Sequence, residues 1–162
     1  FTVIIPRHIN RVKNIELICK KLNLKSQIIS DTEIIDSSSE IIIINSYGVI
    51  QNYLQFCRSV FIGKSMIKNL EKVGGQNPIE AAKLGCKIYH GPYFYNFKEI
   101  YELLNKYKIS EQINNEIELS KKIIADFDNY EKNNSKKISL IDNLGTKILD
   151  ETFNEITRIN NL

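Results

Sequence analysis

Short apolar runs alternate with segments of helical periodicity over the first two thirds of the chain. The most uniform run, residues 41–45, opens with four consecutive isoleucines, whereas residues 10–22 place apolar side chains every three or four positions. Runs of the first kind are typical of buried strands, and spacing of the second kind is typical of amphipathic helices. The pattern predicts strands at 2–5, 27–30, 41–45, 59–63 and 87–90, and helices at 10–22, 47–57, 77–84 and 96–108.

Strands that are apolar throughout and separated by helices indicate a parallel sheet buried on both faces. Right-handed crossovers then give a doubly wound α/β domain. Beyond residue 109 we expect two further helices, 115–127 and 136–159, with Gly145 weakening or kinking the second. The 162 residues suit one domain spanning the whole chain. Because Phe1 directly precedes the first strand, we expect this domain to be a piece of a longer protein.

Composition narrows the choice of partners. Hydrophobic residues make up 43% and charged residues 25% of the chain, which are ordinary values for a globular protein. The net charge is +3, and the lysines are spread among acids, so nucleic acid is not an expected partner. No apolar run approaches the roughly 18–20 residues that span a bilayer, and no signal peptide is recognisable.

Cysteine and histidine spacing offers no metal site. Cys19, Cys57 and Cys86 lie far apart without a CxxC pair, so neither zinc binding nor a disulfide framework is supported. We expect these cysteines to pack as small hydrophobic residues in a reducing cytosol. His8 and His90 have no ligand spacing with any acid or cysteine. The sequence therefore predicts no metal and no cofactor.

The segment GGQNPIE at residues 74–80 is the strongest candidate for chemistry. Its two glycines permit unusual backbone conformations and close approach of another group. Asn77 is a favoured helix cap, Pro78 fits the first helical position and Glu80 the third. This arrangement has two interpretations, which the residues alone leave open. It is either a capping box that satisfies its own backbone donors, or a phosphate site at the start of a helix.

Four polar loops follow predicted parallel strands and should meet at one edge of the sheet. They comprise residues 6–8, 45–48, 74–80 and 91–92. Ligands of open α/β sheets bind where the carboxyl ends of the strands converge. The sequence therefore predicts a ligand site at this edge.

Several short motifs occur in a defined order along these loops. They are PRH at 6–8, NSYG at 45–48, FIG at 61–63, GGQNPIE at 74–80, GP at 91–92 and NF at 96–97. Together they resemble the C-terminal half of 3-deoxy-D-manno-octulosonic acid (Kdo) transferase, an inverting glycosyltransferase of the GT-B fold. The resemblance covers roughly residues 2–104.

The resemblance implies a fold and a function. Family members transfer Kdo from CMP-Kdo to the lipid A precursor in lipopolysaccharide biosynthesis. Two Rossmann-like domains face each other, the N-terminal one holding the acceptor and the C-terminal one the donor. By resemblance this chain is the donor half, and the general base lies on the missing N-terminal domain. We therefore expect the fragment alone to be inactive and soluble, and the parent to act at the cytoplasmic side of the bacterial inner membrane.

The resemblance also implies a donor site, formed by Pro6, Arg7, Tyr47, Gly48, Gly74, Gly75, Asn77 and Glu80. Arg7 would pair with the donor phosphate, because a planar guanidinium binds such groups in a bidentate manner. Pro6 and the backbone at Tyr47 and Gly48 would border the cytosine. Asn77 and neighbouring amides would hold phosphate, and Glu80 would accept hydrogen bonds from the ribose. The alternative for Arg7 is a solvated loop arginine.

Three further residues, His8, Lys64 and Gln76, are additional candidates. His8 is either a ligand contact or a brace for its loop. We expect His90 to be structural and the aromatic run at 93–95 to pack against the core.

The sequence also departs from the family pattern. Asn45 and Val49 stand where the family has acids in Asp-Thr-x-Gly-Glu, and Gln76 stands where it usually has histidine. Two alternatives to a function in CMP-Kdo transfer therefore remain open. The chain could belong to a diverged GT-B enzyme that uses another nucleotide sugar, such as a UDP-sugar. It could instead be a non-catalytic interaction module that kept the fold.

Overall fold

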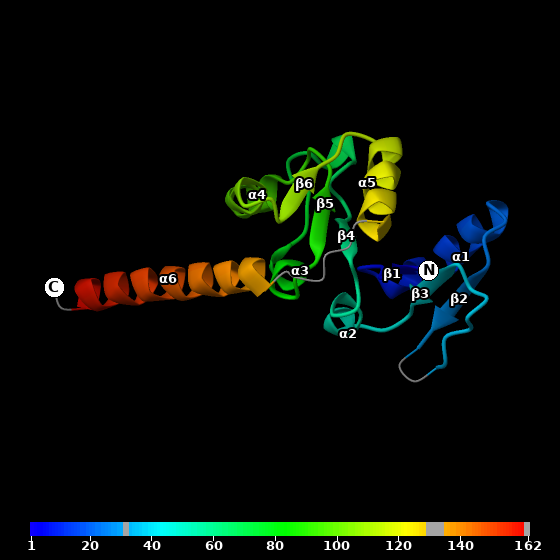
Figure 1. Cartoon of the computed structure of the whole chain (residues 1–162), viewed down its shortest axis with the longest axis horizontal. Helices are drawn as coiled ribbons and strands as arrows, with labels where there is room; N and C mark the ends of the chain where they lie inside the picture. The colour runs from blue at the N-terminus through cyan, green and yellow to red at the C-terminus, as the bar shows by residue number, and fades with distance from the viewer. Residues whose placement is uncertain (31–32, 129–134, 161–162) are drawn as a thin grey trace. The chain divides into compact units, whose positions relative to one another are not determined.

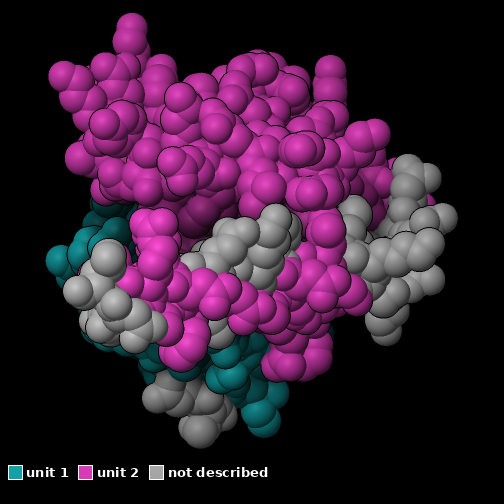
Figure 2. Space-filling model, turned by 90° about the vertical axis from the view of Figure 1, so that its left-hand side faces the viewer, with its two compact units in different colours: residues 1–53 teal, residues 54–162 magenta. Residues whose placement is uncertain are grey.

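The computed structural model describes residues 1–30, 33–128 and 135–160, without the side chains of 135–137, 144, 147–149, 151–152 and 160 (Figure 1). By contacts between Cα atoms the chain divides into two compact units, residues 1–53 and 54–162, coloured separately in Figure 2. The elements in chain order are β1 (Thr2–Ile4), η1 (Ile9–Arg11), α1 (Val12–Lys21), β2 (Ser26–Ile29), β3 (Ile41–Ile44), α2 (Ile50–Leu54), β4 (Ser59–Ile62), η2 (Lys68–Leu70), α3 (Ile79–Lys83), β5 (Lys87–His90), η3 (Tyr95–Phe97), α4 (Lys98–Lys106), β6 (Ser110–Gln112), α5 (Glu116–Asp128) and α6 (Ser135–Asn160).

The first unit contains a parallel sheet with the strand order β1-β3-β2. Its central strand β3 consists of isoleucines whose side chains alternate between the two faces. Ile43 packs with Val12 and Cys19 of α1, whereas Ile42 and Ile44 pack on the other face, in a separate cluster. The prediction of a strand buried on both faces is therefore confirmed.

The second unit contains a parallel sheet with the order β4-β5-β6. One face of it builds the larger core, in which Ile88 of β5 packs with α3 and α4. Tyr101 and Leu104 of α4 and Ala81 of α3 are buried there. The same core holds the N-terminal part of α6, where Ile141 is 8% exposed.

The opposite face of this sheet is more polar and carries α5. The Tyr89 hydroxyl and the Ser59 hydroxyl both donate hydrogen bonds to Asp126 of α5. Lys122 of the same helix forms an ion pair with Glu111 of β6. Burial raises the pKa of Tyr89, and its hydrogen bond to Asp126 adds to this effect. Polar groups therefore help to attach α5 to the sheet.

The predicted class, an α/β arrangement of parallel strands flanked by helices with extra C-terminal helices, is confirmed. The short strand β6 was not predicted. The predicted helix 77–84 is shorter at both ends, and α6 runs through Gly145 without interruption. The segment between the two predicted C-terminal helices, residues 128–135, lies mostly outside the described residues. That residues 1–162 form a single domain stays a prediction.

Candidate functional site

The loops that follow β1 and β3 lie at the same edge of the first unit's sheet, because these strands pair in parallel. Pro6 is half-buried, whereas the Arg7 side chain is exposed. Tyr47 is 64% exposed, and Gly48 has a φ of +77°, a conformation that favours glycine. The structure therefore brings Pro6–Arg7 and Tyr47–Gly48 to one edge, as predicted, with the side chains of Arg7 and Tyr47 exposed.

His8 has a partly structural role in the same unit. Its backbone is extended, and its carbonyl accepts a hydrogen bond of 3.0 Å from the Arg11 amide at the end of η1. Its ring is exposed and does not cap this short helix. The backbone of His8 thus braces the loop, and its ring is open to a ligand.

The glycine pair lies in the second unit, in the long loop between β4 and α3. Both glycines are buried. A Cβ atom on Gly74 would overlap the carbonyl of Tyr93, and one on Gly75 would lie 3.0 Å from the Cα atom of Phe94. Gly75 also has a φ of +79° and donates a hydrogen bond of 3.2 Å to the carbonyl of Lys64. The close approach that requires glycine here is therefore to the protein's own backbone.

Ser65 joins this loop to the loop after β5. It is fully buried, and its hydroxyl donates to the carbonyl of Ile62 at 2.6 Å. The same oxygen accepts the amide of Gly91 at 2.8 Å, and the Ser65 carbonyl accepts the amide of Tyr93 at 2.8 Å. Three hydrogen bonds at one buried residue thus fix the spacing of the two loops at the carboxyl ends of β4 and β5.

An aromatic cluster of His90, Phe94 and Tyr101 lies beneath the glycine loop. The ring of His90 packs 4.4 Å from that of Tyr101 and 4.8 Å from that of Phe94, measured between centroids. Its Nδ1 atom is 2.8 Å from the Gly91 carbonyl oxygen, and its Nε2 atom is 3.2 Å from the side-chain oxygen of Asn105. Burial lowers the pKa of His90, against the opposing effect of these hydrogen bonds. His90 is therefore structural, as expected.

Tyr101 connects this cluster to the loop. Its hydroxyl donates a hydrogen bond of 2.9 Å to the carbonyl of Gln76, and its side chain is fully buried. Burial raises the pKa of Tyr101, so the phenol stays protonated and able to donate. Sequence reasoning missed both Tyr101 and Ser65. Tyr101 lies among the apolar positions of α4, and a single serine after a strand carries no specific signal.

The start of α3 leaves both interpretations of this segment open. The side-chain oxygen of Asn77 accepts the amide of Ile79 at 3.0 Å, so Asn77 turns the chain into the helix. The helix begins at Ile79, two residues later than predicted, and has five residues. Glu80 lies in its first turn with an exposed side chain. Asn77 is exposed as well, so both residues that are predicted to contact CMP-Kdo here, Asn77 and Glu80, are exposed to solvent.

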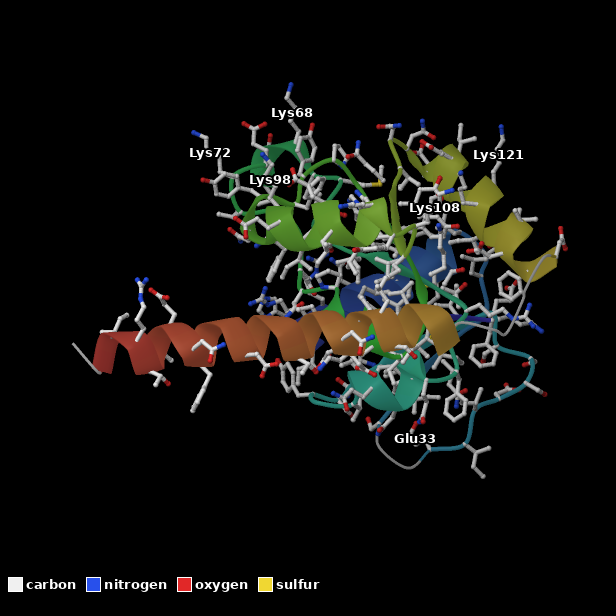
Figure 3. All side chains as sticks on the ribbon, turned by 60° about the vertical axis from the view of Figure 1, so that its left-hand side comes forward. Glu33, Lys68, Lys72, Lys98, Lys108 and Lys121 are labelled. Carbon is white, nitrogen blue, oxygen red and sulfur yellow. The ribbon has the colours of Figure 1, made fainter. Side chains whose placement is uncertain are left out.

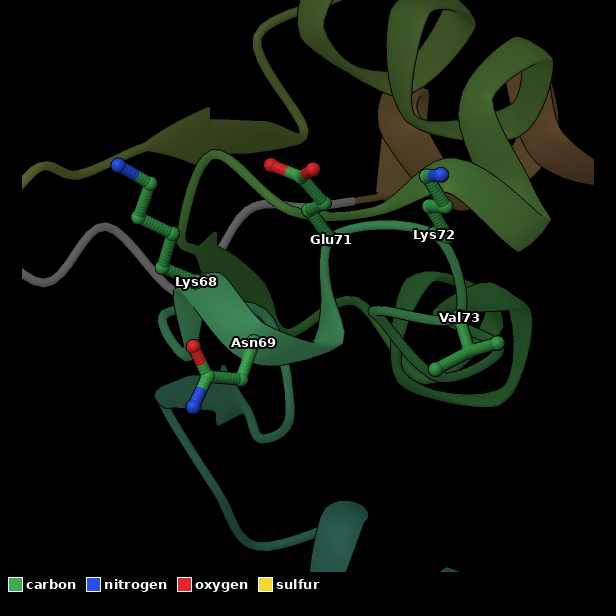
Figure 4. A pocket seen from close by; sticks show the side chains of 5 residues that line it. All are labelled: Lys68, Asn69, Glu71, Lys72 and Val73. Carbon is green, nitrogen blue, oxygen red and sulfur yellow. The ribbon is translucent and has the colours of Figure 1, made fainter.

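The lysines near this loop form no enclosed site. Lys64 is half-buried with a φ of +64°, a left-handed conformation uncommon for lysine. Lys68 and Lys72 extend into solvent (Figure 3). They line an open hollow of about 320 Å³ together with Asn69, Glu71 and Val73 (Figure 4). With Glu71 between the two amines in this view, the hollow has mixed charge and is a solvated loop surface.

The predicted site residues thus fall into two sets. Pro6, Arg7, His8, Tyr47 and Gly48 belong to the first unit, and Lys64, Gly74, Gly75, Gln76, Asn77 and Glu80 to the second. The first set is brought together by the parallel pairing of β1 and β3, whereas the second set lies on the loop between β4 and α3 and in the first turn of α3. A single site that uses both sets stays a prediction.

Over residues 1–30, 33–128 and 135–160, no three His, Cys, Asp or Glu side chains gather as a possible metal site. In the same ranges, no helix is both long and apolar enough to cross a membrane.

Comparison of the sequence with models of known protein families finds no match. Individual relatives do match. The chain is 30% identical over 98% of its length to a 3-deoxy-D-manno-octulosonic acid transferase of Rickettsia conorii, covering 34% of that protein. It is 22% identical over 75% of its length to the Aquifex aeolicus enzyme of the same name, covering 32% of it. The chain thus spans about a third of the length of these relatives.

Solved structures add a match in fold. The C-terminal CMP-Kdo-binding domain of WaaA from Acinetobacter baumannii superimposes with a TM-score of 0.70 at 19% identity. The match covers 87% of this chain and 71% of that domain. The resemblance found in the sequence is therefore confirmed: this chain is similar in sequence to 3-deoxy-D-manno-octulosonic acid transferases and has the fold of a C-terminal CMP-Kdo-binding domain.

Proposed function

We propose that this chain is the donor-binding part of a Kdo transferase and binds the CMP portion of CMP-Kdo. The observation that carries the proposal is the 30% identity over 98% of the chain to a Kdo transferase. The likeness in fold to a CMP-Kdo-binding domain supports the same assignment.

The candidate residues would contribute different groups to the donor. The exposed guanidinium of Arg7 suits a bidentate contact with phosphate, and the backbone at Tyr47 and Gly48 would border the cytosine. Asn77 and the amides near it would hold phosphate, while Glu80 would accept hydrogen bonds from ribose hydroxyls. The phosphate gains negative charge as CMP leaves, and Arg7 would stabilise that charge in the transition state. No metal is needed for these contacts.

The parent protein would transfer Kdo with inversion at the anomeric carbon. Its general base and its contact with a lipid A precursor would come from residues outside this chain, and the reaction would take place at the cytoplasmic side of the inner membrane. The chain alone would therefore bind donor without transferring it. Incubating it with CMP-Kdo and a lipid A precursor checks this, since a Kdo-bearing product above background would contradict it.

Calorimetric titration with CMP tests the binding site. Arg7→Ala should weaken CMP binding about 10- to 100-fold, because charge-assisted hydrogen bonds contribute roughly 1.5–3 kcal/mol. Glu80→Ala should weaken it less, since its ribose contacts carry no opposite charge. Arg11→Ala and Glu99→Ala are matched controls, because these side chains have the same charges and are also exposed. Unchanged affinity in both site variants would refute the assignment.

Ligand comparison separates the alternatives. Tighter binding of UMP than of CMP by the unmodified chain would favour a GT-B enzyme that uses a UDP-sugar. If neither nucleotide binds at millimolar concentration, the chain is better explained as a non-catalytic module.

A further inference from the structure

We propose that Tyr101 is a positioning residue for the donor phosphate, acting through the peptide bond between Gln76 and Asn77. This inference rests on the proposed binding of CMP. Tyr101 lies fully buried in α4 and contacts no solvent. Its effect on the ligand is therefore indirect.

The hydrogen bond from Tyr101 fixes the direction of one peptide group. The hydroxyl of Tyr101 donates to the carbonyl oxygen of Gln76 at 2.9 Å, so this carbonyl points toward the buried phenol. The peptide is trans, and in a planar trans peptide the C=O and the following N–H point in opposite directions. The amide of Asn77 therefore points away from Tyr101, and Asn77 itself is exposed.

Tyr101 itself has no freedom to follow another loop conformation. Its ring packs against His90 at 4.4 Å and against Phe94 at 5.2 Å between centroids. If the peptide turned over, the phenol would lose its acceptor in a buried place, which is costly. The aromatic cluster thus selects one orientation of the Gln76–Asn77 peptide.

The rest of the loop is held independently of Tyr101. The side-chain amide of Asn96 donates to the Val73 carbonyl at 3.3 Å, and the amide of Gly75 donates to the carbonyl of Lys64. Gly75 is in close contact with Phe94. The loop therefore keeps its path when the Tyr101 hydroxyl is removed, and only the peptide orientation is released. An amide donor that is already oriented binds an anion without a reorganisation cost.

The test compares two buried tyrosines of the second unit. Tyr101→Phe removes the hydroxyl and keeps the ring, and CMP affinity should fall about tenfold, the loss expected when one oriented donor is released. The affinity for cytidine, which lacks the phosphate, should stay within about twofold of the unmodified chain. Tyr89→Phe is the matched control, because Tyr89 is 1% exposed and its hydroxyl donates at 2.9 Å to Asp126. It should lower the denaturation midpoint similarly while leaving both affinities unchanged.

The outcomes distinguish this inference from the proposed function. If the unmodified chain binds CMP and Tyr101→Phe binds it equally well, the inference is wrong and the donor site stands. If Tyr101→Phe weakens CMP and cytidine alike, the residue acts on the fold and the inference is again wrong. If the unmodified chain binds no CMP, both proposals fall.

A second measurement does not depend on any variant folding. In the ¹⁵N-labelled chain, the amide resonance of Asn77 should shift when CMP is added and stay in place with cytidine. An Asn77 amide that does not respond, while other amides respond to CMP, overturns the inference.

Discussion

Arg7 and Tyr47 stand exposed on loops of the first unit, whereas Gly74 and Gly75 of the second unit are buried against other backbone. In the first unit the candidate contacts lie on solvent-exposed loops at the carboxyl ends of β1 and β3. In the second unit they lie on a loop whose path is fixed by contacts with buried residues next to it. The difference teaches that candidate residues on an exposed loop can change more freely than those on a loop that the fold itself constrains.

The departures from the family pattern occur in both units. Asn45 and Val49 lie on the first unit's loop after β3, where Asn45 is exposed and Val49 is half-buried against a core cluster. In the second unit Gln76 lies within GGQNPIE, whose two glycines approach the backbone of Tyr93 and Phe94. An exposed side chain can diverge without disturbing the core. Residues that pack backbone against backbone cannot.

The largest expected effect comes from the glycines. Gly74→Ala should lower the free energy of unfolding by about 3 kcal/mol, because its Cβ would overlap the Tyr93 carbonyl. Gly75→Ala and Gly48→Ala form a matched pair, with φ values of +79° and +77°. Only Gly75 has a close neighbour, so its change should cost about 2 kcal/mol and that at Gly48 about 1 kcal/mol. Urea denaturation followed by circular dichroism measures these differences. Equal losses in the free energy of unfolding at Gly75 and Gly48 would contradict the proposed difference between the two units.

The next largest loss of stability is expected from a substitution at Ser65. Ser65→Ala removes the hydroxyl that contacts Ile62 and Gly91, and it leaves a buried carbonyl and a buried amide without that partner. The expected loss is about 2 kcal/mol in the free energy of unfolding. Ser38→Ala is the control in the first unit. Its hydroxyl contacts Asp36 on an exposed loop, so its loss should stay below about 0.5 kcal/mol. A Ser65 variant as stable as the Ser38 variant would show that the two loops of the second unit are not fixed in this way.

The smallest effect is a pH dependence of the second unit. Burial holds the pKa of His90 below its ordinary value of 6.5, so at lower pH the unfolded chain binds more protons than the folded chain. The stability of the folded state should therefore fall as the pH drops below about 6.5, by at most ~1.4 kcal/mol per pH unit, and the contribution should be constant above it. Denaturation at pH 7.5, 6.5 and 5.5 measures the slope. The His90→Gln variant should reduce it, and an unchanged slope would assign the effect to other groups.

The elements of the fold were largely predictable because their patterns are strong. The four isoleucines of β3 and the run Lys87–His90 of β5 were placed correctly or within one residue. The strand β6 was missed because Ser110, Glu111 and Gln112 show no apolar alternation. Its side-chain contacts come from distant parts of the sequence, since Glu111 forms ion pairs with both Lys87 and Lys122.

The residues of the candidate site could be proposed from the sequence, but the structural reasons for several of them could not. The order of motifs indicated which residues are candidates, and the Asn77 side chain does accept the amide of Ile79 at the start of α3. The glycines, however, serve contacts with Tyr93 and Phe94, which lie nearly twenty residues further along the chain. Such contacts depend on the folded path of two loops, which no local pattern contains. The hydrogen bond from Tyr101 to Gln76 was hidden for the same reason.

The polar attachment of α5 has a consequence for motion. Asp126 and Lys122 tie this helix to the sheet through hydrogen bonds and an ion pair with Glu111, and the Lys122 side chain is 41% exposed. Ion pairs at such exposure weaken as dissolved salt screens them. Local opening of α5 should therefore become more frequent with ionic strength, so that its amide protons exchange with deuterium sooner while those of β5 keep their protection.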